Sequence, residues 1–189
     1  MDNLLPLKNS SLVNILTLRY DPSLKPNLPR KTPNDFKINN VIPDTKFIEK
    51  TICDNIEQNL EKFTEKKISI ALSGGVDSTL ALSLTRKVKP DIEIEAISIK
   101  FADSVDETTA ASKIANKFNA NHSILYLENY LSELPKAISI IKLPFWDLHW
   151  YYVAKKSKTL SNVLISGDGG DELFSGYTFR YEKFLSITS

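Results

Sequence analysis

The sequence is poor in three features that would assign it to a special class of protein: cysteine, excess charge and long apolar runs. Cys53 is the single cysteine, which excludes an internal disulfide and predicts a small core residue in a reducing compartment. The formal net charge is +1, so no global field directs the chain to nucleic acid or to an anionic membrane. No apolar run approaches the roughly 20 residues needed to cross a bilayer. We therefore predict a soluble cytoplasmic protein without a membrane or nucleic-acid partner.

Glycine is also scarce, and its distribution is informative. The chain has six glycines, where ordinary usage would give roughly 13. All six fall within 73–79 and 166–177. A glycine in a loop usually indicates only a turn with positive φ. Two clusters that each follow an apolar stretch, and that each carry carboxylates, indicate a pair of ligand-binding loops instead.

Proline marks off the start of the chain. Six of the nine prolines lie within residues 1–45, and proline at this density breaks both helices and sheet ladders. We predict a proline-rich N-terminal extension over 1–45 that is mostly irregular, followed by a folded domain over 46–189. Within the extension, aliphatic and β-branched residues over 12–20 predict one short strand, an edge strand or a dimer contact.

Helical and strand patterns alternate from residue 45 onward. The helical spacing of apolar residues covers 45–66, 77–88, 106–118, 129–141 and 148–158. Short apolar or alternating runs, which predict strands, cover 68–72, 92–99, 122–127 and 162–165. This alternation predicts an α/β fold, a parallel sheet with helices on both faces.

The two glycine loops follow the first and fourth of these strands. In parallel sheets, ligands bind beyond the carboxyl ends of the strands, at the point where the strand order reverses. A spatial strand order of 3-2-1-4 would make the first and fourth strands neighbours at that point. We therefore expect both loops to face one crevice.

The first loop, 73–79, offers backbone N–H groups and hydroxyls at the start of a helix, which suits a phosphate. It lacks the lysine of the Walker phosphate loop. Its carboxylate, Asp77, would repel a phosphate unless a cation lay between them, and this predicts Mg²⁺. The second loop supplies Asp168, Asp171 and Glu172, any of which could add a second ligand. A nucleotide polyphosphate bound through a metal is the simplest interpretation.

These two loops carry a family resemblance. The stretch SGGVDST, residues 73–79, resembles the pyrophosphate loop of the N-type ATP pyrophosphatases, and SGDGGDELFSGY, residues 166–177, resembles the second signature of the asparagine synthetases. Together they extend the resemblance over about 45–181. It implies an adenine nucleotide alpha hydrolase-like fold and a synthetase that forms AMP and pyrophosphate. In this family, ATP adenylates the aspartate side-chain carboxylate and ammonia then displaces AMP.

The resemblance also implies roles for individual residues. The positions that match the family's nucleotide-binding residues are Leu72, Ser73, Gly74, Gly75, Asp77, Ser78, Ile99, Ser166 and Gly167. By the same likeness, Asp77 and Asp171 would hold Mg²⁺, and Asp168 and Glu172 would be the catalytic carboxylates near the adenylate.

The sequence departs from the family in three places. Glutamine-dependent members begin with a catalytic cysteine, whereas Met1 is followed here by Asp2. Ammonia would then be free or come from a separate glutaminase or other subunit. In the family a helical region with an adenylate-stabilising lysine follows the second signature, but this sequence ends twelve residues after Tyr177. Lys100 stands where relatives have a small residue, and it would contact phosphate or point into solvent.

Two other functions stay open beside asparagine synthesis: a truncated, non-catalytic relative that binds nucleotide or a partner subunit, and an enzyme that adenylates another carboxylate. Other residues have structural interpretations. Asp106 and Glu107 are predicted to act as cap and dipole residues at a helix start rather than to steer substrate, and Trp146 and Trp150 to pack in the core rather than line a substrate pocket. His122 and His149 have no partners at zinc-ligand spacing.

Overall fold

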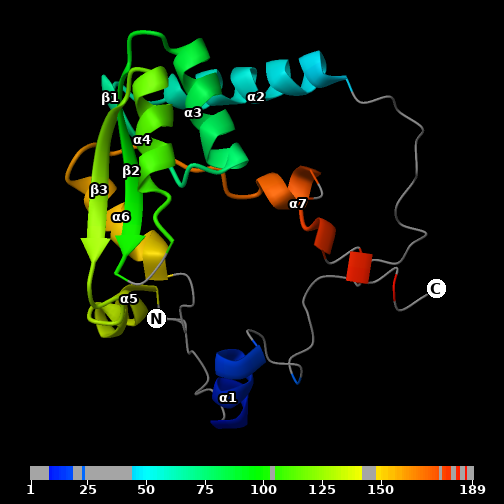
Figure 1. Cartoon of the computed structure of the whole chain (residues 1–189), viewed down its shortest axis with the longest axis vertical. Coiled ribbons are helices and arrows are strands. Elements are labelled where there is room, and N and C mark those ends of the chain that lie inside the picture. Colours follow the sequence, from blue (N-terminus) through cyan, green and yellow to red (C-terminus); the bar gives the residue numbers. More distant parts are fainter. Residues whose placement is uncertain are drawn as a thin grey trace.

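The described residues form one parallel sheet with helices around it. The computed structural model describes residues 9–18, 23, 44–102, 105–141, 148–174, 176–179, 182–183 and 186. In chain order the elements are α1 (Asn9–Leu18), α2 (Thr45–Leu60), β1 (Lys67–Ala71), α3 (Val76–Val88), β2 (Glu93–Phe101), α4 (Thr108–Lys117), β3 (Asn121–Leu127), α5 (Leu134–Ile141), α6 (Leu148–Lys158), β4 (Leu164–Ile165) and α7 (Gly170–Phe174). The strand order is β3-β2-β1-β4, and every pairing is parallel (Figure 1). The predicted fold class and the predicted order 3-2-1-4 are both confirmed.

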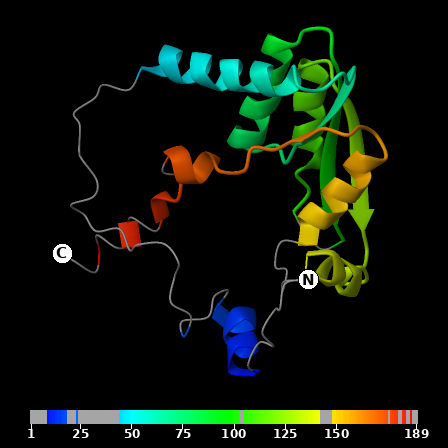
Figure 2. The ribbon, with the colours of Figure 1, turned by 180° about the vertical axis from the view of Figure 1, so that it is seen from behind.

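Helices cover both faces of the sheet, as Figures 1 and 2 show from opposite sides. On one face, α3 and α4 pack on the strands and bury a core in which Ile68, Ile70 and Leu82 have no exposed surface. On the other face, α5 and α6 form a second cluster around Ala137 and Leu148. The strand β1 is buried on both faces, since Ile68, Ser69 and Ile70 have no exposed surface.

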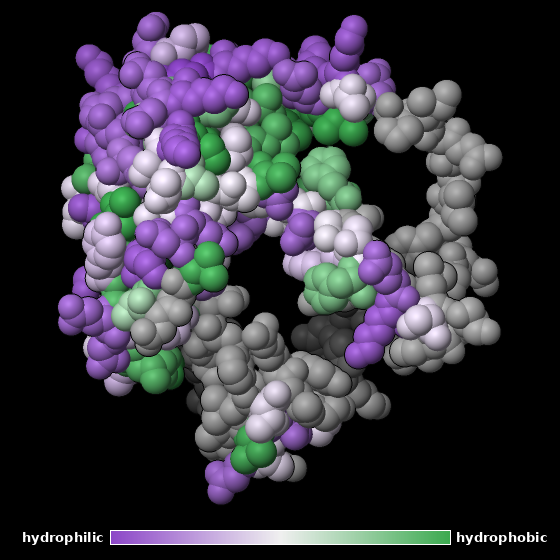
Figure 3. All heavy atoms as spheres, viewed as in Figure 1, coloured by the Kyte–Doolittle hydropathy of each residue, from purple (hydrophilic) through white to green (hydrophobic). Residues whose placement is uncertain are grey.

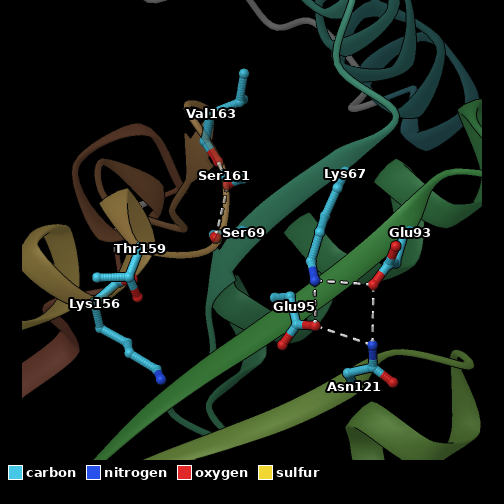
Figure 4. A network of polar contacts seen from close by, with 9 residues as sticks. All are labelled: Lys67, Ser69, Glu93, Glu95, Asn121, Lys156, Thr159, Ser161 and Val163. Atoms are coloured by element: carbon cyan, nitrogen blue, oxygen red, sulfur yellow. Dashed lines mark hydrogen bonds and ion pairs between the residues drawn. The ribbon is translucent and has the colours of Figure 1, made fainter.

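The buried carboxylate of Glu95 is paired at the amino ends of the strands. The Lys67 ammonium lies 2.9 Å from a carboxylate oxygen of Glu93 and 2.9 Å from one of Glu95 (Figure 4). The Asn121 amide donates to Glu95 at 3.0 Å. Burial alone would raise the pKa of the Glu95 carboxyl, but the bonds from Lys67 and Asn121 outweigh it and hold that pKa below its ordinary value.

Arg86 ties three segments together near the same end of the sheet. From α3, its guanidinium donates to the carbonyls of Pro90 at 2.7 Å and Ile92 at 2.8 Å, in the connection to β2. It also donates to the carbonyls of Phe118 at 2.9 Å and Asn119 at 2.8 Å, in the turn between α4 and β3. The guanidinium therefore provides hydrogen bonds to backbone carbonyls near helix and strand ends, which have no partner within the helix or the sheet.

The strand predicted over 12–20 is wrong, because α1 is a helix over Asn9–Leu18. A short apolar run is compatible with a strand or a helix, and residues that favour strands form one only where a neighbouring strand is available for pairing. The helix predicted over 45–66 ends earlier, at Leu60. Most of the irregular extension predicted over 1–45 lies outside the described residues. No helix in the described part of the chain has the length and apolarity that a membrane crossing requires.

Hydrophobic residues also gather on the surface beside α3, below α2, as Figure 3 shows in green. The α3 side chains of Val76 and Leu80 are 83% and 40% exposed. Val76 is the first residue of α3 and directly follows the glycines of the first loop.

Candidate functional site

The two glycine loops touch at the carboxyl ends of β1 and β4. A Cβ atom added at Gly167 would lie only 2.7 Å from the backbone carbon of Asp77 and the backbone nitrogen of Ser78. A Cβ atom at Gly170 would lie 2.5 Å from the carboxylate carbon of Asp77. Glycine at these two positions therefore lets the second loop lie directly against the start of α3.

Hydroxyls organise the first loop from within. The Ser73 N–H donates to Ser78 Oγ at 3.2 Å, and the Gly75 N–H donates to Ser73 Oγ at 3.2 Å. The Thr79 hydroxyl donates back to the Gly75 carbonyl at 2.7 Å, and Gly74 has a φ of +86°, which favours glycine. Gly75 is the N-cap of α3 and provides no side-chain cap. The first turn of α3 therefore presents backbone N–H groups and the positive end of a helix dipole to an anion.

A pocket of about 380 Å³ opens beside these loops. Seven of the residues expected from the sequence line it: Leu72, Ser73, Asp77, Ser78, Ile99, Gly167 and Asp168. Apolar groups from β1, β2 and α6 line it together with the polar groups of the two loops. Gly74 and Gly75 belong to the first loop without appearing in this lining, and Ser166 Oγ accepts from the Asp168 N–H at 3.4 Å.

A second pocket, of about 480 Å³, continues from the first along the loop 166–177. The carboxylates that line it are Asp77, Asp168, Asp171 and Glu172. The Tyr177 hydroxyl, which also lines this pocket, donates to Glu172 Oε1 at 2.6 Å. The structure thus brings all four carboxylates singled out from the sequence to one place, with Asp77 and Asp168 shared by both pockets.

The donor set suits Mg²⁺ held jointly with a polyphosphate. Within the described residues, no group of three or more His, Cys, Asp or Glu side chains is arranged to hold a metal on its own. Asp77 and Asp171 line the same pocket, and no hydrogen bond or ion pair among the described residues engages the Asp77 carboxylate. Magnesium typically takes one or two carboxylates and completes its shell with phosphate oxygens and water.

The aromatic residues at the start of α6 belong to the pockets, which the sequence did not lead us to expect. His149 and Trp150 line both pockets, with their rings 5.5 Å apart. The prediction that Trp150 packs in the core is wrong, and Trp146 lies outside the described residues. Both pocket residues lie in the first turn of α6, and in α/β units that end of a helix lies at the carboxyl edge of the sheet, where ligands bind. That position was the signal available in the sequence.

Of the two carboxylates expected to cap α4, only Asp106 accepts hydrogen bonds there, from the position before the N-cap. Glu107 is the N-cap residue but makes no side-chain capping bond, and it lines the first pocket. The Thr108 hydroxyl donates to Asp106 Oδ1 at 2.6 Å, and the Thr108 N–H donates at 2.9 Å. These bonds hold the pKa of Asp106 below its ordinary value. Lys100 donates to the carbonyl of Phe101 at 2.8 Å and lies outside the lining of both pockets.

Comparison with solved structures supports the same fold. The NH3-dependent NAD synthetase of Campylobacter jejuni superposes with a TM-score of 0.50 at 19% identity, over 72% of this chain and 62% of that one. A glutamine-dependent NAD+ synthetase of Acinetobacter baumannii, solved with ADP, superposes with a TM-score of 0.55 at 15% identity, over 75% of this chain and 29% of that one. Identities this low show a shared fold alone.

Sequence relatives are more specific. A glutamine-hydrolysing asparagine synthetase of Bacillus subtilis is 30% identical over 150 residues, which cover 75% of this chain and 23% of that protein. A second such protein, described as putative, from Methanocaldococcus jannaschii is 33% identical over 111 residues, 56% of this chain and 22% of its own. The chain thus spans less than a quarter of these relatives. The model of the family described as asparagine synthase matches residues 58–188, more than two thirds of the sequence, and the chain therefore belongs to the asparagine synthase family.

Proposed function

We propose that this chain binds Mg²⁺-ATP and acts as an asparagine synthetase-like ligase that adenylates the side-chain carboxylate of aspartate for amidation by ammonia. The observation that carries this proposal is the contact between the loops after β1 and β4, which border one pocket. A synthetase of this kind must hold a nucleotide and a carboxylate with their reacting atoms close together. Two connected pockets with shared residues provide that arrangement.

The first pocket is proposed to take the nucleotide. Leu72 and Ile99 give an apolar surface for the adenosine, and Gly167 lines the same pocket from the second loop. Ser166, which the sequence also pointed to, is not in the lining of either pocket. The pyrophosphate part would lie on 73–78, where N–H groups and hydroxyls converge at the start of α3. Donors fixed before the reaction stabilise the charge that develops as pyrophosphate leaves.

Mg²⁺ is proposed to bind between the two loops. Asp77 and Asp171 would hold it, and when bound it would neutralise charge on the phosphate oxygens. The Gly170 backbone lies against the Asp77 carboxylate, so the second loop limits where that carboxylate can point. Asp77 is therefore held at the boundary between the two pockets, which is where a polyphosphate bound on the first loop would reach the second.

The second pocket is proposed to take the acceptor. An oxygen of the acceptor carboxylate attacks the α-phosphorus, and the bond to the bridging oxygen breaks as pyrophosphate leaves. The ammonia nitrogen then attacks the acyl carbon, and AMP leaves with the electrons of the broken C–O bond. Asp168 lines both pockets, and we propose that it accepts the proton that nitrogen loses. Glu172, oriented by the Tyr177 hydroxyl, is proposed to bind the acceptor or ammonia.

One observation favours a second candidate, adenylation of a carboxylate other than aspartate. The described residues that line the second pocket include four carboxylates and neither lysine nor arginine. The second carboxylate of aspartate would find no cationic side chain in that lining, whereas an acceptor with one carboxylate and an ammonium group would be matched better.

One assay separates these candidates. Pyrophosphate and AMP release from Mg²⁺-ATP is measured with aspartate, ammonia, both or neither, with glutamine replacing ammonia in a further arm, and then with monocarboxylate amino acids. Release that requires aspartate supports the leading proposal, and release that requires another acid supports the second candidate. ATP binding without turnover for any acceptor would refute both and indicate a non-catalytic relative.

Paired aspartate variants test the proposed metal ligands. Asp77→Asn and Asp171→Asn should each raise the Mg²⁺ concentration needed for half-maximal turnover by at least about tenfold, because a carboxylate ligand is lost. Asp54→Asn is the matched control, since Asp54 pairs with Lys50 on the exposed side of α2. If all three variants needed the same Mg²⁺ concentration, the assignment of the metal to these two carboxylates would be wrong.

A further inference from the structure

A chain of side-chain hydrogen bonds crosses the sheet behind the candidate site. The Ser98 hydroxyl, on β2, donates to the carbonyl of Leu72 and also contacts His122 Nε2 at 2.7 Å. On the other side of the ring, His122 Nδ1 lies 2.8 Å from the hydroxyl oxygen of Ser112 on α4. Ser98 and Leu72 are 4% and 2% exposed, and both line the first pocket. His122 itself lies in neither pocket lining.

The contacts permit one arrangement of protons. A carbonyl oxygen can only accept, so the single hydrogen of Ser98 lies on the bond to Leu72. Ser98 Oγ must then accept from His122 Nε2, which therefore carries a hydrogen. Burial lowers the pKa of His122, so the ring is neutral at pH 7 and Nδ1 accepts from Ser112. Hydrogen bonds therefore run in one direction, from Ser112 through His122 and Ser98 to Leu72.

The end of this chain lies at the entry to the glycine loop. Leu72 is the first residue after β1, and its N–H still donates to the Ile97 carbonyl at 2.9 Å. Its carbonyl belongs to the peptide plane that joins Leu72 to Ser73. The other side of that plane is held as well, because the Ser73 N–H donates to Ser78 Oγ. Ser98 and Ser78 thus hold the two ends of one peptide plane.

We propose that His122 is a positioning residue for the nucleotide: through Ser98 it fixes the peptide plane at which β1 passes into the loop 73–79. This inference rests on the proposed binding of ATP to that loop. If Ser98 lost its partner on β3, its hydroxyl could rotate away from Leu72, and the peptide plane would lose one of its two restraints. The loop would then sample orientations that do not match the phosphates, at a cost to affinity.

Two substitutions of His122 separate positioning from packing. The amide nitrogen of glutamine stands the same number of bonds from Cβ as imidazole Nε2, so His122→Gln retains a donor to Ser98. The asparagine amide reaches only the place of Nδ1, so His122→Asn loses that donor. We expect His122→Asn and Ser98→Ala each to raise the ATP dissociation constant about 3- to 10-fold, and His122→Gln to raise it less than about 2-fold.

Ser69→Ala is the matched control for stability. Ser69 is a fully buried hydroxyl on β1, and it bonds to Ser161 Oγ at 2.8 Å away from both pockets (Figure 4). Its removal should lower the free energy of unfolding about as much as Ser98→Ala does, with ATP affinity unchanged. Titration calorimetry with Mg²⁺-ATP and urea denaturation measure the two quantities. If affinity fell in step with stability in all these variants, His122 would have only a structural role and the proposal would be overturned.

The proton arrangement can be tested without any variant or nucleotide. In ¹⁵N NMR of the native protein at pH 7, His122 should show a protonated Nε2 and an unprotonated Nδ1. A hydrogen on Nδ1, whether the ring is neutral or is an imidazolium, would overturn the proposal. This measurement uses the native protein, so it does not depend on whether the variants fold. If the native protein bound no ATP, the proposed function would be refuted and the nucleotide role of His122 with it, whereas an ¹⁵N result against Nε2 would refute the relay alone.

Discussion

The contact between the two glycine loops gives the sharpest prediction, for Gly167→Ala. The new Cβ would lie 2.7 Å from backbone atoms of Asp77 and Ser78. Ordinary contact begins at 3.4 Å, so the two segments must separate by about 0.7 Å. Backbone atoms cannot rotate aside as a flexible side chain would. Overpacking of this kind typically costs about 1–3 kcal/mol.

The same separation moves the loops away from a shared ligand. Displacements near 1 Å at a reacting site can lower rates about 100-fold. We therefore expect Gly167→Ala to raise the dissociation constant of Mg²⁺-ATP at least tenfold and to lower the free energy of unfolding by about 1–3 kcal/mol. Titration calorimetry and urea denaturation measure these two effects on the same preparation.

Gly169→Ala is the control in the same loop. Gly169 has a φ of +91° and open space around the position of a Cβ. Alanine there costs backbone strain of about 1–2 kcal/mol but pushes nothing toward α3. Its ATP affinity should stay within about threefold of the native value, a change that corresponds to less than 1 kcal/mol. If Gly167→Ala bound ATP as tightly as Gly169→Ala, close approach of the loops would not matter for the nucleotide.

Three further predictions concern stability, each measured by urea denaturation. Arg86→Lys keeps the charge but loses the guanidinium group that donates to four carbonyls, so it should lower the free energy of unfolding by about 2–4 kcal/mol. A loss below about 1 kcal/mol would show that Arg86 does not tie these segments together. The folded-state pKa of Glu95 is lowered from 4.5, so the stability that Glu95 contributes is present above pH 4.5 and is lost as pH falls through the folded-state pKa. Glu95→Gln should therefore make the free energy of unfolding fall less steeply below pH 4.5. If the variant's free energy of unfolding had the same pH dependence as that of the native protein, this role of Glu95 would be wrong. Asn119 has a φ of +51°, so Asn119→Ala should cost about 1 kcal/mol and Asn119→Gly less; equal costs would exclude backbone strain as the cause.

The alternation of strand and helix patterns was sufficient to predict the fold, and the positions of glycine after the strands predicted which two loops border the candidate pocket. Loops that follow the first and fourth strands meet only if those strands are neighbours, and β1 does pair with β4. The residue types in these two loops then predicted that Ser73, Asp77 and Asp168 would border one ligand site, and all three line the first pocket. These inferences needed only the direction of each strand and the identity of the residue after its last buried position.

What the sequence did not predict depends on contacts between distant residues. The apolar run over 12–20 fits a strand and a helix, and only tertiary context decides between them. His122 differs from an ordinary core histidine only because Ser98 and Ser112 approach its two nitrogens, from positions 24 and 10 residues away. Trp150 has the spacing of a core residue, but the start of α6 places it in both pockets.

Two pairs of carboxylates lie at opposite edges of the sheet and differ in what they contact. Glu93 and Glu95 stand at the amino end of β2, where Lys67 pairs with both. Asp77 and Asp168 follow the carboxyl ends of β1 and β4, and both line the pockets. Helix N-termini converge at that second edge, and their N–H groups favour anions without the help of a cationic side chain. For these four carboxylates, position relative to a strand end separates the structural acids Glu93 and Glu95 from the candidate ligands Asp77 and Asp168.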